Sequence, residues 1–340
     1  MRSQPARLAE ADLVAALERG WDIPATAVSY FAVGAGSHHW RVEDRHHQAW
    51  FVTVDDLDGR RSGPRESRAD VFDRLVAALA TAHALKADGA DYVVAPIAER
   101  TGGVLHRLGD EWALAVYPMI DGETFRGGQA LPVADRLAVV DVIARLHTAS
   151  LPTPLHARSD DYQLQNRADL EAAIADADGH ADAGPYSRPL AGLLAEHRHL
   201  IVDLLTEYDD LAGAARAHND RTVLTHGEPH AGNSVRTPSG WMLVDWDTAL
   251  LAAPERDMWL LEPGDGLASA AYAAATGVEV LPDRLALFRL RWDLADLGVD
   301  LARLCAPHAN NADDARSWDG ISHVLTRRRS GDAVPRAAWR

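Results

Sequence analysis

Three polar side chains lie between residues 222 and 257 at a spacing that suits phosphoryl transfer. Glu228 follows one short apolar run, Asn233 comes five residues later, and Asp245 follows a second short apolar run. Transfer of a phosphoryl group to a hydroxyl requires a carboxylate that orients the hydroxyl, together with oxygen ligands for Mg²⁺. Glu228 can fill the first role, and Asn233 and Asp245 can fill the second. The stretch therefore predicts a catalytic centre for phosphoryl transfer.

Other interpretations of the same stretch are weaker. His226, Glu228 and His230 could be zinc ligands. The helical zinc motif, however, has glutamate directly after its first histidine, and Pro229 would break the helix that this motif requires. A zinc deaminase needs a later cysteine pair, whereas Cys305 is the only cysteine of the chain. An ordinary polar hairpin loop remains the plain alternative.

The flanking pattern predicts which elements present these side chains. Apolar runs at 222–225 and 241–244 are expected to be strands, and residues 237–240 supply a turn signal between them. We interpret the segment as a hairpin in which each strand delivers a carboxylate at its end.

The first 118 residues have the pattern of a sheet with two helices. The predicted strands span residues 30–33, 40–43, 50–54, 92–97 and 113–117, and the predicted helices span 8–19 and 70–86. Gly34, Gly36 and Ser37 form a glycine-rich turn between the first two strands, which is the order of a phosphate-covering loop. A plain hairpin turn that needs glycine for positive φ is the alternative.

The rest of the chain is overwhelmingly helical in its apolar spacing. The predicted helices span residues 135–147, 168–177, 189–214, 267–275 and 282–305, with a final surface helix within 306–340. The pattern breaks at 118–122. We therefore predict an N-terminal nucleotide-binding lobe over residues 1–118 and a helical C-terminal lobe, with the catalytic loop and substrate site, over 119–340.

Composition narrows the class of protein. The net charge of −16, from 34 basic and 50 acidic residues, argues against a nucleic-acid partner and permits a cationic small-molecule substrate. A single cysteine excludes an internal disulfide framework. The first residues lack a secretory pattern, and no run approaches the roughly 18 apolar residues that span a membrane. We expect a soluble cytoplasmic protein without a membrane partner, and the sequence does not indicate its oligomeric state.

Taken together, these features resemble the aminoglycoside phosphotransferase family. The most specific segments are His226–Asn233 and Leu243–Asp247, and the resemblance extends over about residues 30 to 304. Asp245-Trp-Asp247 and Pro254–Asp257 are most similar to the spectinomycin-kinase-like branch. The resemblance implies an α+β, protein-kinase-like two-lobed fold with a small antiparallel-sheet N-lobe and a mainly helical C-lobe. It also implies ATP and Mg²⁺ as cofactors and an activity of the antibiotic-resistance type.

The resemblance implies roles for individual residues. Glu228 falls on the catalytic carboxylate, Asn233 and Asp245 fall on the metal ligands, and Ser37 approaches the β-phosphate. With the hinge glycine aligned on Gly122, the carbonyl of Pro118 and the N–H of Ile120 contact adenine. Proline lacks only the N–H, which that position does not use.

Two departures from the family pattern stand out. Glu228 occupies an aspartate position, so its carboxylate lies about one C–C bond further out, although near-attack geometry tolerates errors of only about 1 Å. The third strand carries Thr53 where the family has a phosphate-binding lysine, and Lys86, the only lysine, lies too far along the chain. Either an arginine substitutes for this lysine, with Glu66 or Asp70 as its acidic partner, or Mg²⁺ alone meets the phosphate charge. The candidates are Arg41, Arg60, Arg61, Arg65 and Arg68. We interpret the loop that carries the last four as a solvated surface segment, and the two acids as helix N-terminal residues.

Four aspartates are weaker candidates for binding substrate ammonium groups. They are Asp247, Asp265, Asp293 and Asp296. Asp247 could equally bind a second metal ion or cap a helix, and Asp293 and Asp296 could be ordinary polar residues of a helix. Residues 255–257 are expected to form a structural ion-pair cluster in which Asp257 stabilises the catalytic loop.

The sequence thus predicts an ATP-dependent phosphotransferase that acts on a hydroxyl of a small cationic molecule of the aminoglycoside or aminocyclitol type. Two alternatives stay open. The acceptor could be another metabolite such as choline, homoserine or a sugar. The missing lysine and the change at Glu228 also allow a catalytically weak, pseudokinase-like nucleotide-binding protein.

Overall fold

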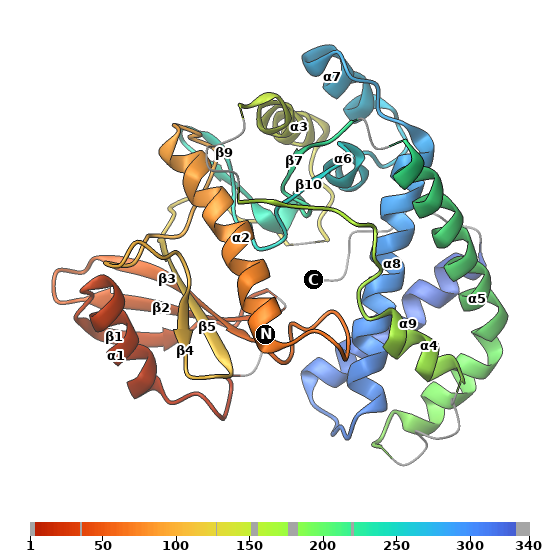
Figure 1. The fold of residues 1–340 in the computed structure, drawn as a ribbon, viewed down its shortest axis with the longest axis horizontal. Helices are drawn as coiled ribbons and strands as arrows, with labels where there is room; N and C mark the ends of the chain where they lie inside the picture. Colours follow the sequence, from red (N-terminus) through yellow and green to blue (C-terminus); the bar gives the residue numbers. More distant parts are fainter. Residues whose placement is uncertain are drawn as a thin grey trace.

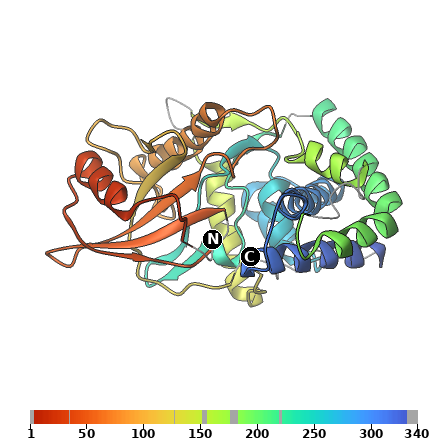
Figure 2. The ribbon, with the colours of Figure 1, turned by 90° about the horizontal axis from the view of Figure 1, so that it is seen from below.

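The computed structural model describes residues 4–34, 36–126, 128–150, 156–175, 183–218 and 221–330. An antiparallel sheet with two helices forms one side of the molecule, and a mainly helical part forms the other (Figures 1 and 2). The sheet comes first in the chain, as the sequence predicts. Among the described residues, no helix is both long enough and apolar enough to cross a membrane.

Five strands in the order β1-β2-β3-β5-β4 build the N-terminal sheet. They are β1 (Ala25–Tyr30), β2 (Ser37–Asp44), β3 (Ala49–Asp56), β4 (His106–Leu108) and β5 (Trp112–Pro118). Alternating side chains of β2 and β3, such as Trp40, Val42, Val52 and Val54, are buried against α1 (Glu10–Trp21) on one face. The opposite face packs on α2 (Arg68–Ala87), which a Ser67–Asp70 capping box begins (Figure 1).

Two predicted strands differ from the structure, and one observed strand was not predicted. The first strand lies at 25–30 and not at 30–33, because residues after Tyr30 already turn toward the glycine-rich segment. The short strand β4 was not predicted. Residues 92–97 form no strand of the N-terminal sheet, although Ile97 N donates to Val116 O of β5 (2.7 Å). Val94 N donates to Leu243 O (3.0 Å) and Leu243 N donates to Tyr92 O (2.7 Å), so this segment ties the two parts of the molecule together.

The helical part is organised around α8 (Pro282–Cys305), whose bounds are those predicted. It packs against α4, α5, α6 and α9 in the largest apolar core. The remaining helices are α3 (Val133–Thr148), α4 (Arg167–Ala175), α5 (Ser187–Ala217), α6 (Glu255–Leu261), α7 (Leu267–Thr276) and α9 (Ala312–Arg329). The predicted end of α4 at 176–177 lies outside the described residues, and so do the last ten residues of the segment 306–340 in which the final helix was predicted.

Two small sheets in this part carry the catalytic stretch. In one, β7 (Val223–Thr225) pairs antiparallel with β10 (Leu250–Ala252), which pairs parallel with β6 (Arg158–Ser159). In the other, β8 (Ser234–Thr237) and β9 (Gly240–Leu243) form a hairpin closed by the predicted turn. The predicted pairing of 222–225 with 241–244 is therefore wrong, because the polar loop supplies a strand of its own as partner for β9.

Candidate active site

A buried carboxylate fixes the backbone of the catalytic loop that follows β7. Asp257, the third residue of α6, accepts hydrogen bonds from His226 N (2.8 Å) and Gly227 N (2.5 Å). Its side chain is 0% exposed and lies 3.0 Å from His147 Nε2. Burial alone would raise the pKa of Asp257, but the hydrogen bond and charge of His147 lower it below its usual value. The predicted role of Asp257 is confirmed.

The sharp turn at Gly227 is possible only because this residue has no side chain. Its φ is +101°, and an added Cβ would lie 2.5 Å from the guanidinium nitrogens of Arg256. Arg256 in turn donates to Thr225 Oγ1 and Thr248 O, both at 2.8 Å. Residues 255–257 therefore act separately and not as one ion-pair cluster, since Glu255 pairs with Arg221 at 2.9 Å.

The buried imidazole of His226 joins the two halves of the site. Its Nε2 donates to Val244 O (2.8 Å), directly before Asp245, and its Nδ1 accepts from Glu228 N (3.2 Å). Burial lowers the pKa of His226, so the neutral ring that this pattern requires is favoured. Trp246 packs edge-on against the ring at 4.7 Å. One side chain therefore sets the relative positions of Glu228 and Asp245.

Asn233 is oriented as a metal ligand would need to be. Its Nδ2 donates to Glu228 O (3.0 Å), which directs the amide oxygen to the other side. Its backbone carbonyl accepts from Val244 N (3.0 Å), so Asn233 lies beside the start of the Asp245 segment. His230 caps the short 3₁₀ turn at Ala231–Asn233 and accepts from Asn233 N at 3.2 Å.

Asp245 lies where negative charge is concentrated. Its backbone adopts φ = 64°, which is uncommon for a residue with a side chain. The carboxylate is open to solvent at one side, yet the surrounding protein, Asp247 and Glu228 raise its pKa well above the usual value.

This donor set fits Mg²⁺. Among the described residues, no group of three or more His, Cys, Asp or Glu side chains could hold a metal ion unaided. Mg²⁺, however, is usually held by one or two carboxylates together with substrate phosphates. Hard oxygen donors from Asn233 and Asp245 suit that ion, and a divalent cation would relieve the repulsion at Asp245.

A positively charged side chain, Arg60, contacts the end of the glycine-rich turn. Gly34 and Gly36 have φ of +65° and +86°, and Ser37, the first residue of β2, is buried. Ser37 Oγ donates to Asp55 Oδ1 (2.8 Å) and accepts from Arg60 Nη2 (2.8 Å). Arg60 therefore does not extend into solvent, and the interpretation of its loop as a solvated surface segment is wrong for this residue.

The other candidate cations have different partners. Arg61 and Arg68 both pair with Asp58, at 2.7 and 2.5 Å, and Arg41 pairs with Glu43. The two acids proposed as partners of the phosphate-binding arginine have other partners. Asp70 belongs to the capping box of α2, and Glu66 pairs with Arg74 at 3.1 Å.

Thr53 stands at the position of the expected lysine, and Tyr117 on the adjacent strand β5 pairs with Phe51, two residues before Thr53. Burial and the nearby charges of Asp245, Asp55 and Asp247 raise the pKa of Tyr117 well above its usual value. The phenol therefore stays protonated and remains a hydrogen-bond donor beside these carboxylates.

The hinge segment packs tightly on the hairpin β8–β9. A Cβ at Gly122 would lie 2.6 Å from Val235 Cγ1 and 2.9 Å from Arg236 O. Glu123 and Arg236 exchange both backbone hydrogen bonds, at 2.8 and 3.0 Å. Gly122 therefore fits the position of the hinge glycine because only glycine allows this approach.

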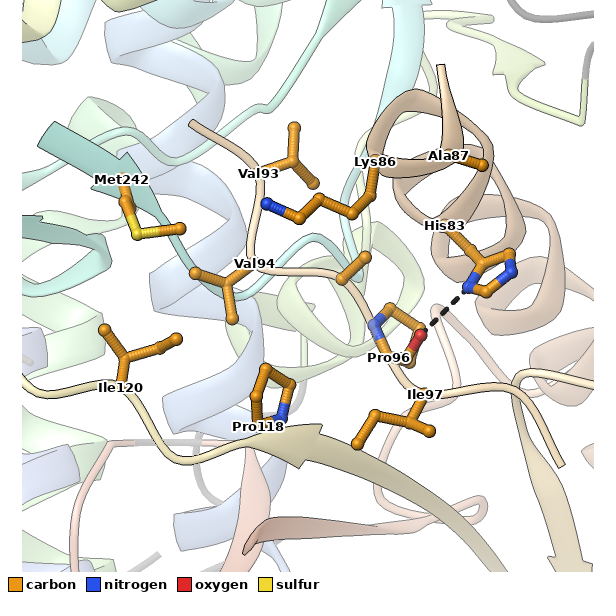
Figure 3. A pocket seen from close by; sticks show the side chains of 11 residues that line it. His83, Lys86, Ala87, Val93, Val94, Pro96, Ile97, Pro118, Ile120 and Met242 are labelled. Carbon is orange, nitrogen blue, oxygen red and sulfur yellow. Dashed lines mark hydrogen bonds between the residues drawn. The ribbon is translucent and has the colours of Figure 1, made fainter. Parts of the chain in front are cut away.

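Pro118 and Ile120 line a cavity of about 310 Å³ (Figure 3). Its wall is mainly apolar, and Lys86 at the end of α2 reaches into it together with Val94 and Met242 (Figure 3). None of the predicted catalytic or metal-binding residues lines this cavity. The cavity thus lies apart from the chemistry, and the chain's only lysine lies there as well.

The four aspartates proposed for substrate binding have different partners and different burial in the structure. Asp293 is 2% exposed and contacts Arg327 (2.5 Å) and Arg328 (2.6 Å), so it is a structural residue and the substrate prediction for it is wrong. Asp265 pairs with Arg136 at 2.5 Å and accepts from Leu267 N at the start of α7. Asp296 is half-buried on α8.

Asp247 is the candidate that lies beside the predicted site residues. Its carboxylate pairs with Arg60 at 2.5 Å and helps to raise the pKa of Asp245. It does not begin a helix, because the next residues enter strand β10.

The sequence interpretation missed two residues of the site, Asp55 and Tyr117. Strand alternation could have found Asp55, because it lies two residues after Thr53 and so shares its face of β3. No local signal indicates Tyr117, which comes near Thr53 only through the pairing of β3 with β5.

A small antiparallel sheet, a hinge and a helical lobe with this loop define a protein-kinase-like fold. The spectinomycin phosphotransferase APH(9)-Ia, solved with ADP and spectinomycin, has a similar fold, with a TM-score of 0.70, 17% identity, and coverage of 97% of this chain and 100% of that one. The amicoumacin kinase hAmiN, solved with AMP-PNP, Ca²⁺ and Ami, has a TM-score of 0.62, 13% identity, and coverage of 98% and 97%.

Sequence similarity identifies the family. Residues 27–288 match the phosphotransferase enzyme family. The chain is also 31% identical to Protein StrN of Streptomyces griseus over 310 residues, which are 88% of this chain and 86% of that protein. The chain therefore belongs to the phosphotransferase enzyme family. It is a kinase-type enzyme, as the sequence analysis predicts.

Proposed function

We propose that the chain transfers the γ-phosphoryl group of ATP to a hydroxyl of a small cationic molecule of the aminoglycoside or aminocyclitol type. The observation that carries the proposal is the convergence of the loop that bears Glu228 and Asn233 with the separate segment that bears Asp245, which His226 links to that loop. Nucleotides in the complexes of the similar structures support ATP as the donor. We place the reaction in the cytoplasm, where ATP is available.

Binding of the two substrates is assigned to the two lobes. Residues 1–118 would bind the nucleotide through Gly34, Gly36, Ser37 and Thr53, and the hinge would contact adenine through Pro118 O and Ile120 N. Residues 119–340 would bind the acceptor. Phe51, Met242 and Val244 pack as partly buried apolar residues against one common core and offer apolar surface to a purine.

In the chemical step, Glu228 orients the acceptor hydroxyl and accepts its proton. The hydroxyl oxygen bonds to the γ-phosphorus while the bond from that phosphorus to the ADP oxygen breaks, so the phosphoryl group passes directly to the acceptor. Asn233 and Asp245 would hold Mg²⁺, which neutralises phosphate charge when bound. The hydrogen bonds of Asp257 hold the loop rigid, which lowers the reorganisation needed during transfer.

The charge of the molecule favours a cationic acceptor. The net charge is −16, and Glu228, Asp245 and Asp247 add negative charge at the catalytic centre itself. The similar structures are a spectinomycin phosphotransferase solved with spectinomycin and an amicoumacin kinase solved with Ami, and both support an antibiotic-like acceptor. Asp247 and Asp296 remain the proposed contacts for its ammonium groups.

The test is a transfer assay with radiolabelled ATP, Mg²⁺ and a panel of acceptors. The panel contains aminoglycosides, aminocyclitols, choline, homoserine and neutral sugars. We expect transfer to a cationic aminocyclitol or aminoglycoside. Transfer only to a neutral sugar, choline or homoserine would overturn the acceptor class. Nucleotide binding without transfer to any of them would overturn the activity and favour the pseudokinase alternative.

A further inference from the structure

Arg60 lies at the centre of the charge network of the proposed nucleotide site, although it belongs to a loop outside the sheet. Its Nε donates to Asp55 Oδ1 (2.8 Å), and its Nη2 contacts Ser37 Oγ (2.8 Å) and Asp247 Oδ2 (2.5 Å). The side chain is 21% exposed. One guanidinium thereby contacts the glycine-rich turn, the end of β3 and the segment after the proposed metal ligand Asp245.

The remaining donors of Arg60 lie beneath the glycine-rich turn. A guanidinium has five N–H groups, and the two on Nη1 make no hydrogen bond to the described part of the chain. A Cβ added at Gly36 would lie 3.3 Å from this same Nη1. The glycine backbone and an unused pair of donors therefore border the same space.

The local charges require a cation at this point. Asp55, Asp247 and Asp245 together outweigh the single positive charge of Arg60, and Glu228 adds a fourth carboxylate near Asp245. Burial would lower the pKa of Arg60, but the three aspartates raise it well above its usual value, so the guanidinium stays charged. A phosphate chain would meet strong repulsion here without it.

We propose that Arg60 binds the phosphates of the nucleotide through Nη1, with Asp55 as the residue that positions its guanidinium. The inference rests on the proposed function, because it concerns the same nucleotide. Arginine suits this role because its guanidinium has N–H groups in several directions. One edge can pair with a carboxylate that positions it while another edge binds a phosphate. Thr53 carries no charge, and Lys86 lines the cavity at the hinge, whose lining includes neither Ser37 nor Asp55 (Figure 3). The positive charge therefore enters the site from the loop after β3 and not from β3 itself.

The test compares the affinities of ATP, ADP and adenosine, measured by calorimetry with Mg²⁺, for the wild type, Arg60→Ala and Arg60→Lys. We expect Arg60→Ala to lose at least about tenfold in affinity for ATP and ADP, since hydrogen bonds to charged groups are lost. Affinity for adenosine should stay within twofold, and Arg60→Lys should recover part of the loss. Arg65→Ala, an exposed arginine of the same loop, is the matched control and should bind like the wild type.

The outcomes separate this inference from the proposed function. ATP affinity within twofold of wild type in Arg60→Ala would overturn the role of Arg60, and so would an equal loss for adenosine. If Arg60→Ala does not fold, as judged by thermal melting, the decision rests on Arg60→Lys, whose ATP affinity must fall while its adenosine affinity does not. A wild type that binds ATP but transfers no phosphate overturns the activity alone, and a wild type that binds no nucleotide overturns both.

Discussion

Replacement of Asp257 by asparagine tests whether a single buried carboxylate holds the catalytic loop. The change keeps the size of the side chain, but one of its two oxygens becomes an NH₂ group. Because Oδ2 accepts from His226 N and Oδ1 accepts from Gly227 N, either orientation of the amide sets a donor against a backbone donor. The negative charge opposite His147 is also lost.

The expected loss follows from these contacts. One buried N–H loses its partner, and the other hydrogen bonds become neutral, so we expect Asp257→Asn to lower the free energy of unfolding by about 3 kcal/mol. The assay is denaturant unfolding followed by fluorescence. Hydrogen exchange at the amides of His226 and Gly227 should speed up by about two orders of magnitude, because local opening becomes easier by the same amount.

The control is Asp203→Asn, the same chemical change at an exposed position of α5, which should stay within about 0.5 kcal/mol of the wild type. The reasoning is refuted if Asp257→Asn behaves like this control in both assays. Phosphoryl transfer should fall as well, since the displaced loop carries Glu228.

Three further predictions concern the base, the hinge and the pH dependence of stability. Glu228→Gln should lower the rate of transfer by about 10²–10⁴-fold with ATP affinity nearly unchanged, which steady-state kinetics and calorimetry would measure; an unchanged rate would exclude Glu228 as the base. Gly122→Ala should destabilise the fold by about 1–3 kcal/mol in the unfolding assay, because its Cβ would lie 2.6 Å from Val235 Cγ1. The control is Gly192→Ala on α5, whose Cβ would meet nothing within 4 Å and which should be neutral or stabilising. Burial lowers the pKa of His39 to about 4, so the unfolded chain binds more protons between that pH and about 6.5. The melting temperature should therefore rise with pH across this window, and the rise should be smaller in His39→Phe; equal slopes would contradict the assignment.

The proximity of the candidate site residues could be predicted because they are close together in the chain. Glu228 and Asn233 are separated by a short 3₁₀ turn, and Asp245 follows the next hairpin, so local spacing already brings them together. The helical periodicity of α8 gave its bounds because one apolar stripe is buried along its whole length. The order of a sheet followed by helices was predictable as well, because the apolar periods of strands and of helices are both local properties of the sequence.

Only the tertiary structure decided which charged residues belong to the site. Arg60 and Arg61 are neighbours in one polar loop, yet Arg60 reaches Asp55 and Asp247 while Arg61 pairs with Asp58. Asp293 was a candidate for substrate binding from its residue type alone, but the folding of α9 against α8 buries it between two arginines. Partner choice for an ion pair depends on contacts between residues far apart in the chain. Residue type and spacing do not specify these contacts, because a charged side chain in a polar segment can be satisfied by water or by any counter-ion that the fold brings near.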